Sequence, residues 1–226
     1  MARSKAYLFR GVEIRWSCDP TLVEGKPTPA KDVFHFPAGL TDFLKALLES
    51  RDTVVPEPFA GETDLAESQG RIEWAVAWPV DEDGYQGFYC NTVPTALGGT
   101  HEQGFRAALL KALRTHAERV AYKKAAILTA DDITGGAAIL VSLFYKTPQF
   151  QGQTKERLVS PEVARLVEAA VKDRFELWLG EHPATATALL DHLVMRAEER
   201  LARKKSKEVK RQTATRKLRL PGKLAD

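Results

Sequence analysis

AAILVSLFY, from Ala137 to Tyr145, is a nearly continuous apolar run of strand length that is rich in β-forming residues. Polar and apolar side chains do not alternate along it, so the run predicts a central strand with both faces buried. Helical and strand patterns interleave on either side of this run. The sequence therefore indicates a mixed α/β architecture built around residues 137–145.

Shorter strands and a helix are expected at the N-terminal end. Residues 6–16 predict a half-buried strand, because apolar and charged side chains alternate in its second half. Residues 33–39 predict a short returning strand, and residues 40–50 carry large apolar side chains at helical spacing. Residues 17–32 and 52–70 are rich in proline and other turn-forming residues, which predicts loops.

Two further strands are expected before the central run. RIEWAVAWP, residues 71–79, alternates cleanly, and one face is formed by Ile72, Trp74, Val76 and Trp78. YQGFYCNTV, residues 85–93, follows the turn DEDG. Because consecutive strands joined by a short turn commonly pair, we expect these two to form an antiparallel hairpin.

A long amphipathic helix is predicted from LGGTHEQGFRAALLKALRTHAERV, residues 97–120, in which Thr100 and Gln103 have the spacing of a capping box. Its glycines invite comparison with a phosphate loop, but the stretch matches neither the Walker A pattern nor the dinucleotide-binding pattern. The favoured interpretation is that Gly98 and Gly99 turn the backbone into the helix and that Gly104 allows close packing.

Two more helices are expected towards the C-terminus. The first has Ser160 as its N-cap and Pro161 at its first position, and it ends near Gly180. Its sheet-facing side should be formed by Val163, Leu166, Val167, Ala170, Val171, Leu177 and Trp178. The second begins at Pro183, and its apolar stripe is Leu189, Leu190, Leu193, Val194, Ala197 and Leu201.

The positive charge of the chain is concentrated at its C-terminal end. Residues 196–226 hold twelve Lys and Arg against four Asp and Glu, a net charge of +8, while the remainder carries −5. A basic segment of this kind can attract a polyanion without the rest of the chain taking part. A solvated charged helix is the alternative interpretation.

Several classes of function lack support in the sequence. No apolar run is long enough for a transmembrane helix and no secretory signal pattern is present, so we expect a cytoplasmic protein without a membrane partner. Cys18 and Cys90 are far apart, and no metal-binding or nucleophile motif is present, so no metal site is predicted. We interpret the histidines as surface or packing residues: His35, His101, His116, His182 and His192.

One loop has the residues to contact an anion. It lies between the central run and the next helix and contains Gln153, Thr154 and Lys155. An amide, a hydroxyl and a flexible ammonium could together contact a terminal phosphate that approaches from outside the domain. Surface loops commonly contain such residues, so the tripeptide alone does not define a phosphate site.

Four stretches together resemble the B subunits of bacterial type IIA DNA topoisomerases, and the topoisomerase IV B subunits more than the gyrase B subunits. They are GGTHEQGFRAAL, TPQFQGQTKERL, AVKDRFELWL and the closing LPGKLAD. The resemblance spans essentially the whole chain. It implies an α+β fold: a transducer domain like domain 2 of ribosomal protein S5, with a mixed sheet, followed by long C-terminal helices.

The resemblance also implies a division of the chain. Residues 1–159 would form the S5-like transducer domain, and residues 160–182 a helix packed on its sheet. Residues 183–226 would form a basic helical linker that leads towards an absent TOPRIM domain. The nucleotide-binding half and the TOPRIM motif of the family are missing from the sequence, so we expect a middle fragment that by itself neither hydrolyses ATP nor cleaves DNA.

By position, Gln153 and Lys155 match family residues that reach a neighbouring GHKL-type ATPase domain and touch the γ-phosphate of ATP. Lys155 would be the sensor of that phosphate, and Thr154 would set the shape of the loop. ATP and Mg²⁺ would be bound in the full-length protein. The implied partners are a DNA duplex, the topoisomerase IV A subunit and, through the missing ATPase domain, a second copy of the same protein.

The basic helix gains an interpretation from the same resemblance, because in the family the helices after the transducer line the cavity that admits the transported duplex. The candidates for sequence-independent phosphate contact are Arg106, Arg196, Arg200, Arg203, Lys204, Lys205, Lys207, Lys210 and Arg211. A stand-alone S5-like nucleic-acid-binding module without nucleotide coupling is the alternative function. A transducer from a mismatch-repair or chaperone relative is a third, against which LPGKLAD argues.

Overall fold

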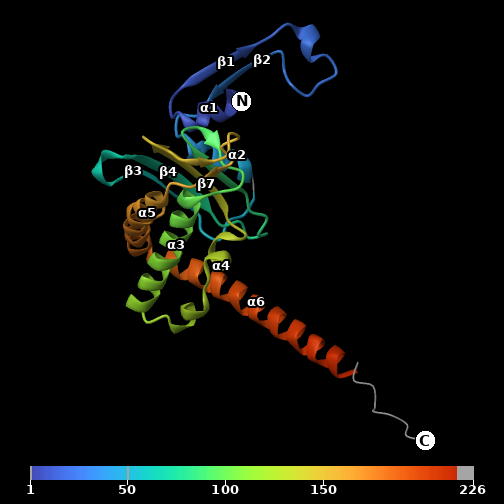
Figure 1. Cartoon of the computed structure of the whole chain (residues 1–226), viewed down its shortest axis with the longest axis vertical. Coiled ribbons are helices and arrows are strands. Elements are labelled where there is room, and N and C mark those ends of the chain that lie inside the picture. Colours follow the sequence, from blue (N-terminus) through green and yellow to red (C-terminus); the bar gives the residue numbers. More distant parts are fainter. Residues whose placement is uncertain (1, 50, 218–226) are drawn as a thin grey trace, which may run out of the picture.

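A computed structural model describes residues 2–49 and 51–217, and of residue 67 and residues 210–217 it describes the backbone alone (Figure 1). The α-helices are α1 Ala2–Leu8, α2 Leu40–Leu48, α3 Thr100–Arg119, α4 Ala130–Thr134, α5 Pro161–Glu181 and α6 Pro183–Lys217. The strands are β1 Glu13–Ser17, β2 Lys31–His35, β3 Phe59–Asp64, β4 Gly70–Ala77, β5 Gln86–Cys90, β6 Val93–Pro94, β7 Ala138–Tyr145, β8 Phe150–Gln151 and β9 Arg157–Leu158. Short 3-10 helices span Pro20–Val23, Ala66–Ser68 and Lys123–Ile127.

Strand β7 is the central strand of a mixed five-stranded sheet with the order β3-β4-β7-β5-β6. It pairs antiparallel with β4 and parallel with β5, so that Val141 lies opposite Trp74 on one side and Phe88 on the other. Seven of its eight residues are buried, and Phe144 is intermediate. The prediction of a two-sided central strand over residues 137–145 is confirmed.

The prediction that β4 and β5 form a hairpin is wrong, because β7 lies between them in the sheet. The connection between the two strands spans residues 78–85. It is longer than the two- to five-residue loops that typically join the paired strands of a hairpin, so its two strands need not be neighbours in the sheet. The indole nitrogen of Trp78 donates to the carbonyl of Ile133, and Arg51 pairs with Asp81, so this connection is itself held in place. The apolar β7 takes the central position, where both of its faces are covered.

A strand was missed in the segment expected to be a loop over residues 52–70. β3 pairs antiparallel with β4 along its whole length, from Phe59 opposite Val76 to Asp64 opposite Arg71. It is an edge strand whose burial alternates, with Ala60, Glu62 and Asp64 exposed. Glycine and acidic residues mask the alternation in the sequence, although charged residues are a common protection for a sheet edge.

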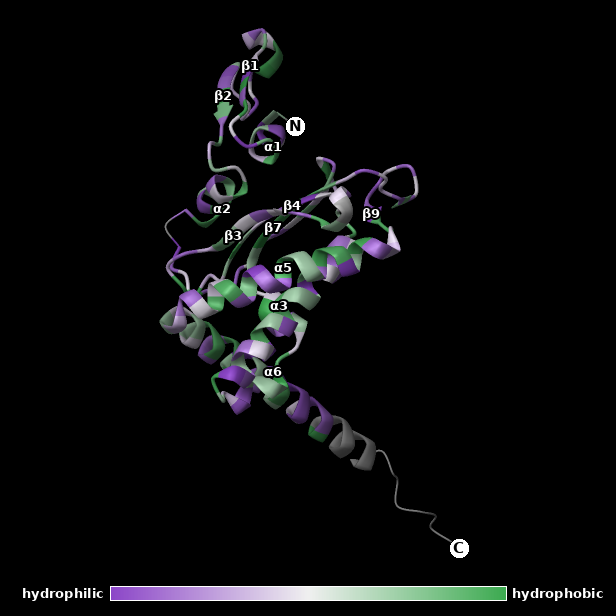
Figure 2. Ribbon diagram, turned by 90° about the vertical axis from the view of Figure 1, so that its left-hand side faces the viewer, coloured by the Kyte–Doolittle hydropathy of each residue, from purple (hydrophilic) through white to green (hydrophobic). Residues whose placement is uncertain are grey.

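Helices cover both faces of the sheet (Figure 2). On one face α1 and α2 pack on the small side chains of β4 and β7, including Ala75, Ala77 and Ala138. On the other face Ile72, Trp74 and Val76 meet α3, α5 and the first part of α6 in the larger core. The face predicted from the alternation of residues 71–79 therefore packs in the larger core. The smaller residues between these positions pack in a second core on the other face.

The N-terminal segment differs from its prediction. Residues 2–8 form α1 rather than strand, and the strand begins only at Glu13. The hairpin of β1 and β2 projects beyond α1 (Figure 1), and Val12 and Trp16 are more than 40% exposed, so the expected half-burial is wrong. The returning strand and the following helix, β2 and α2, are confirmed.

The three long helices α3, α5 and α6 are confirmed, with corrections at their ends and faces. Thr100 is not a capping residue: Gly99 occupies the N-cap of α3 without a side-chain bond, whereas a capping box forms at Thr129 and Asp132, at the start of α4. Leu177 and Leu201 are 54% and 40% exposed, so neither belongs to the apolar face expected for its helix.

Helices α3 and α5 lie close together because Gly104 faces the backbone of α5. A Cβ atom at residue 104 would lie 2.3 Å from the carbonyl oxygen of Ala164. Neither helix could keep its present position with a larger residue there, since backbone atoms cannot rotate away. The interpretation of Gly104 as a close-packing residue is confirmed.

We therefore expect Gly104→Ala to lower the free energy of unfolding by about 1 to 3 kcal/mol, as overpacking does in other cores. Gly180→Ala is the matched control, because the same substitution near the end of α5 meets no atom within 4 Å. It should be neutral or raise stability by up to about 1 kcal/mol through helix propensity. Chemical denaturation of both variants checks this, and equal effects would contradict it.

Candidate functional site

Gln153, Thr154 and Lys155 lie at the tip of a small hairpin formed by β8 and β9. Its strands pair through Phe150 with Leu158 and through Gln151 with Arg157. Gly152 has a φ of 73° and lets the chain turn at the start of the tip, where all three side chains are exposed. The predicted anion-contacting loop is therefore a hairpin tip that is open to solvent.

The base of this hairpin is attached to the loop before α3. The Leu158 amide donates to the carbonyl of Gly98 over 3.2 Å, and the Leu97 amide donates to the carbonyl of Glu156 over 2.9 Å. At Gly99, where φ is 143°, a Cβ atom would lie 2.3 Å from the carbonyl oxygen of Leu158. Gly98, with a φ of 67°, is needed for a left-handed turn, and Gly99 is needed for the close approach of the hairpin.

The C-terminal side of the hairpin is held by a second set of bonds. The Val159 amide donates to the carbonyl of Gln149 over 2.8 Å, and the Gln149 amide donates to the Ser160 hydroxyl over 2.9 Å. Ser160 does occupy the N-cap of α5, as predicted, but its hydroxyl serves the hairpin instead of capping the helix.

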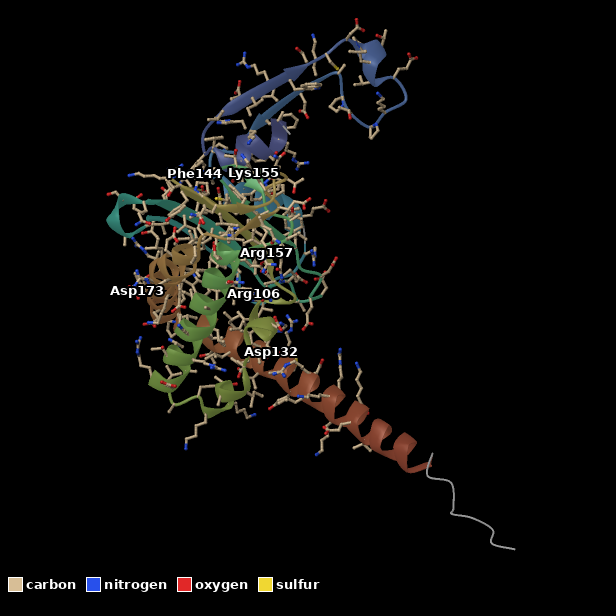
Figure 3. The ribbon with its side chains drawn as sticks, in the orientation of Figure 1. Arg106, Asp132, Phe144, Lys155, Arg157 and Asp173 are labelled. Atoms are coloured by element: carbon tan, nitrogen blue, oxygen red, sulfur yellow. The ribbon has the colours of Figure 1, made fainter. Side chains whose placement is uncertain are left out.

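Lys155 combines a strained backbone with an exposed charge. Its φ of 57° lies in the left-handed region, which costs a residue with a Cβ atom about 1 to 2 kcal/mol. Its ammonium lies 5.9 Å from the centre of the Phe150 ring, at the outer limit of a cation–π contact. Arg157, which was not among the predicted site residues, adds a second exposed cation on the same hairpin (Figure 3).

A second charged region lies where α6 passes α4 and begins to extend beyond the rest of the fold. Arg200 donates to both carboxylate oxygens of Asp132, over 2.7 and 3.0 Å, and to the carbonyl of Ile127. Burial alone would raise the pKa of the Asp132 carboxyl, but the bonds from Arg200 and Thr129 outweigh it and hold that pKa below its usual value. Asp132 is therefore an ionised, nearly buried attachment point for α6.

Other predicted DNA-facing arginines are also paired with acids of this chain. Arg106 lies 3.0 Å from Glu102 and 2.8 Å from Asp131. Arg196 lies 3.3 Å from Glu82, which His192 also approaches. Arg203 pairs with Glu199 one turn before it. The positive charge of these side chains is partly balanced within the molecule.

Three lysines beyond Arg203 have no such partner among the side chains that the structure describes. Lys204, Lys205 and Lys207 are exposed and form no ion pair with any side chain that the structure describes. The backbone of Lys210 and Arg211 is helical, and their side chains lie outside the described residues. Figure 3 shows Lys155 and Asp132 well apart, so the hairpin tip and the base of the exposed helix are two separate sites.

The titratable residues of the interior do not suggest a metal centre. Among residues 2–49 and 51–217, no three His, Cys, Asp or Glu side chains gather closely enough to hold an ion. His101 is buried, with its Nε2 atom 3.0 Å from the Thr95 hydroxyl, and burial lowers its pKa to about 4. His101 is a packing histidine, as the sequence suggested.

Within the described part of the chain, no helix is both long and apolar enough to cross a membrane.

The comparisons with known proteins agree with one another on the family that this chain resembles. A model of the family described as DNA gyrase B matches residues 39–209. Over its whole length the chain is 54% identical to the B subunit of DNA topoisomerase 4 from Caulobacter vibrioides and 51% identical to that from Bartonella bacilliformis. It covers 33% of each of these proteins, so the chain spans about a third of the length of the curated relatives it matches.

Solved structures agree with these sequence matches. The ATP binding domain of topoisomerase IV from Francisella tularensis, in complex with a small-molecule inhibitor, superposes with a TM-score of 0.71 at 26% identity, covering 88% of this chain and 52% of that one. The 43K ATPase domain of Thermus thermophilus gyrase B, in complex with an aminocoumarin, gives 0.70 at 28% identity, covering 92% and 54%.

The buried His101 makes stability depend on pH. Its pKa is lowered from 6.5 to about 4 in the folded chain, so between these values the unfolded chain binds more protons and acid favours unfolding. The folded state should lose on the order of 1 to 2 kcal/mol between pH 7 and pH 5 through this residue. His101→Gln should reduce that loss, as measured by denaturation at both pH values, and an unchanged loss would refute the assignment.

Proposed function

The chain belongs to the DNA gyrase B family, and from this premise we propose that it is the transducer segment of the B subunit of an ATP-dependent type II topoisomerase. Through Gln153 and Lys155 it senses the γ-phosphate of ATP in a neighbouring GHKL domain, and it couples that state to DNA strand passage. Thr154 shapes the loop. Residues 1–159 form an S5-like transducer domain, residues 160–182 its packing helix, and residues 183–226 a basic linker towards a TOPRIM domain.

The observation that carries this proposal is the geometry of Lys155. An exposed ammonium stands at the tip of a hairpin whose base is fixed by bonds to Gly98 and Ser160, and its backbone is held in a strained conformation. Other exposed turn residues of this chain, such as Glu49 and Glu82, also have a positive φ, so it is the combination with an exposed positive charge at a fixed hairpin tip that suits Lys155 to contact an anionic ligand. The similar solved structures include an ATP binding domain and an ATPase domain, which supports ATP as the ligand.

The free energy of one contact between Lys155 and a phosphate is large enough to switch a protein between two conformational states. A charge-assisted contact between a lysine and a phosphate contributes about 1.5 to 3 kcal/mol. A contact made in only one of two states biases their equilibrium by that difference, which is roughly ten- to a hundredfold. Loss of the γ-phosphate on hydrolysis would therefore release the hairpin and let the domains move.

ATP and Mg²⁺ would be bound mainly by parts of the full-length protein outside this chain. The partners in this proposal are duplex DNA, the topoisomerase IV A subunit and a second copy of the full-length protein, and the site of action is the cytoplasm. A stand-alone nucleic-acid-binding module without nucleotide coupling is the competing function, because the exposed basic end of α6 would serve it equally well.

For DNA, we propose that the exposed end of α6 makes sequence-independent phosphate contacts. Lys204, Lys205 and Lys207 are the strongest candidates, because their charges are unpaired within the described residues. Lys210 and Arg211 continue the same segment. Arg106, Arg196, Arg200 and Arg203 would first have to exchange an acidic partner of this chain for a phosphate.

Nucleotide coupling is tested in the full-length protein that contains this chain. Lys155→Ala should lower kcat for ATP hydrolysis by about 10- to 100-fold, because a charge-assisted contact to the reacting phosphate is lost. Lys124→Ala is the control, since that exposed lysine lies in the 3-10 helix after α3, and it should leave turnover unchanged. Unchanged turnover in Lys155→Ala would favour the competing function.

DNA contact is tested by the salt dependence of binding. In the full-length protein, the triple variant Lys204→Ala/Lys205→Ala/Lys207→Ala should lower the slope of log K against log salt by about 2.7, since each phosphate contact contributes about 0.9. A triple variant of exposed lysines elsewhere, Lys31→Ala/Lys123→Ala/Lys124→Ala, should keep the slope. Fluorescence anisotropy with duplex DNA measures both, and equal slopes would contradict the assignment.

A further inference from the structure

The two ends of the segment that carries the Lys155 hairpin meet at one side-chain contact. Tyr145 is the last residue of β7, and Glu162 is the second residue of α5. The Tyr145 hydroxyl lies 2.7 Å from a carboxylate oxygen of Glu162 and 2.9 Å from the side-chain oxygen of Gln69. A tyrosine hydroxyl has one proton to donate, and the carboxylate is the stronger acceptor.

The backbone of Tyr145 is fixed from a third direction. The Asn91 side chain accepts from the Tyr145 amide and donates to the Tyr145 carbonyl, each over 2.8 Å. Asn91 has a φ of 48° in the turn between β5 and β6, a conformation that Asn tolerates better than most residues. The Lys146 amide also donates to the carbonyl of Gln69. The end of β7 is therefore a rigid point from which the hairpin segment departs.

Glu162 is well suited to receive the hydroxyl proton. It lies in the first turn of α5, where the helix dipole favours a negative charge. The bond from Tyr145 stabilises the carboxylate and holds the pKa of Glu162 below its usual value. A charged acceptor at this place gives the contact more strength than a neutral pair would have.

We propose that Tyr145 is a positioning residue for Lys155: by bonding Glu162 it fixes the separation of β7 and α5, and so the direction in which the hairpin tip projects. This inference rests on the proposed function and names a determinant of the same site. The bonds at Gly98 and Ser160 hold the hairpin to its surroundings, whereas the Tyr145–Glu162 bond joins the two elements from which the hairpin is suspended.

The structure offers a matched pair of variants to test this. Tyr145→Phe removes only the hydroxyl from a buried ring. Tyr122→Phe removes a hydroxyl that bonds an acid at a distant place, because Tyr122 donates to Asp191 of α6. Both changes delete one tyrosine-to-carboxylate hydrogen bond, and Tyr145→Phe also removes the contact of the hydroxyl with Gln69. A difference between them therefore reports on location and not on the loss of such a bond in general.

Two measurements in the full-length protein are compared. Hydrogen exchange of the backbone amides of residues 149–159 should become about tenfold faster in Tyr145→Phe, as expected for loss of one charged hydrogen bond, and should stay unchanged in Tyr122→Phe. In ATP hydrolysis, Tyr145→Phe should lower kcat by about three- to tenfold with KM within about twofold, because Lys155 is misplaced and the rest of the ATP site is intact. Tyr122→Phe should leave kcat unchanged.

Two substitutions of Glu162, the residue that accepts the hydrogen bond from Tyr145, complete the test. Glu162→Gln keeps an oxygen that can accept from Tyr145 and should retain most of the activity, while Glu162→Ala should behave as Tyr145→Phe does. Faster exchange with unchanged kcat in Tyr145→Phe would overturn the positioning role. If Lys155→Ala impairs turnover and Tyr145→Phe does not, only this inference fails; if Lys155→Ala has no effect, the proposed function fails with it.

Discussion

The structure depends on β7 being paired on both sides and covered on both faces. Its hydrogen bonds with β4 and β5 leave no open edge, and its side chains reach into both cores. A strand in this position cannot shift register by one residue, because every buried side chain would change face. The place where β7 ends is therefore fixed, and the hairpin with Gln153 and Lys155 begins shortly beyond that point, at β8.

Much of the fold could be predicted from periodicity alone, because burial imposes a repeat on the sequence. The apolar run of β7, the alternation of β4 and the helical stripes of α2, α3 and α5 are all direct records of burial. What failed were choices that periodicity does not record. The neighbour of β4 depends on which strand gains most from the central position, and β3 hides its pattern behind glycine and acidic residues at an edge.

The candidate site was only partly accessible from the residues. Lys155 and Gln153 drew attention through their type, and the resemblance supplied a role, which stays a prediction. Asp132 was not among the predicted site residues, although its spacing of three from Thr129 is that of a capping box and could have indicated a helix start. Tyr145 and Asn91 gave no signal, because their importance arises from contacts between segments more than fifty residues apart. Only the three-dimensional structure brings such segments together.

Because α6 is long, a small change at its attachment to the domain produces a large displacement at its far end. The bond of Arg200 to Asp132 attaches α6 to the rest of the fold, and α6 continues from there to Lys217 (Figure 1). At about 1.5 Å per residue, the part beyond Arg200 is a lever arm of about 25 Å. A tilt of about 10° at its pivot would displace the tip by about 4 Å, more than the length of a hydrogen bond. Mechanical gain of this kind lets a small adjustment inside the domain become a large movement outside it.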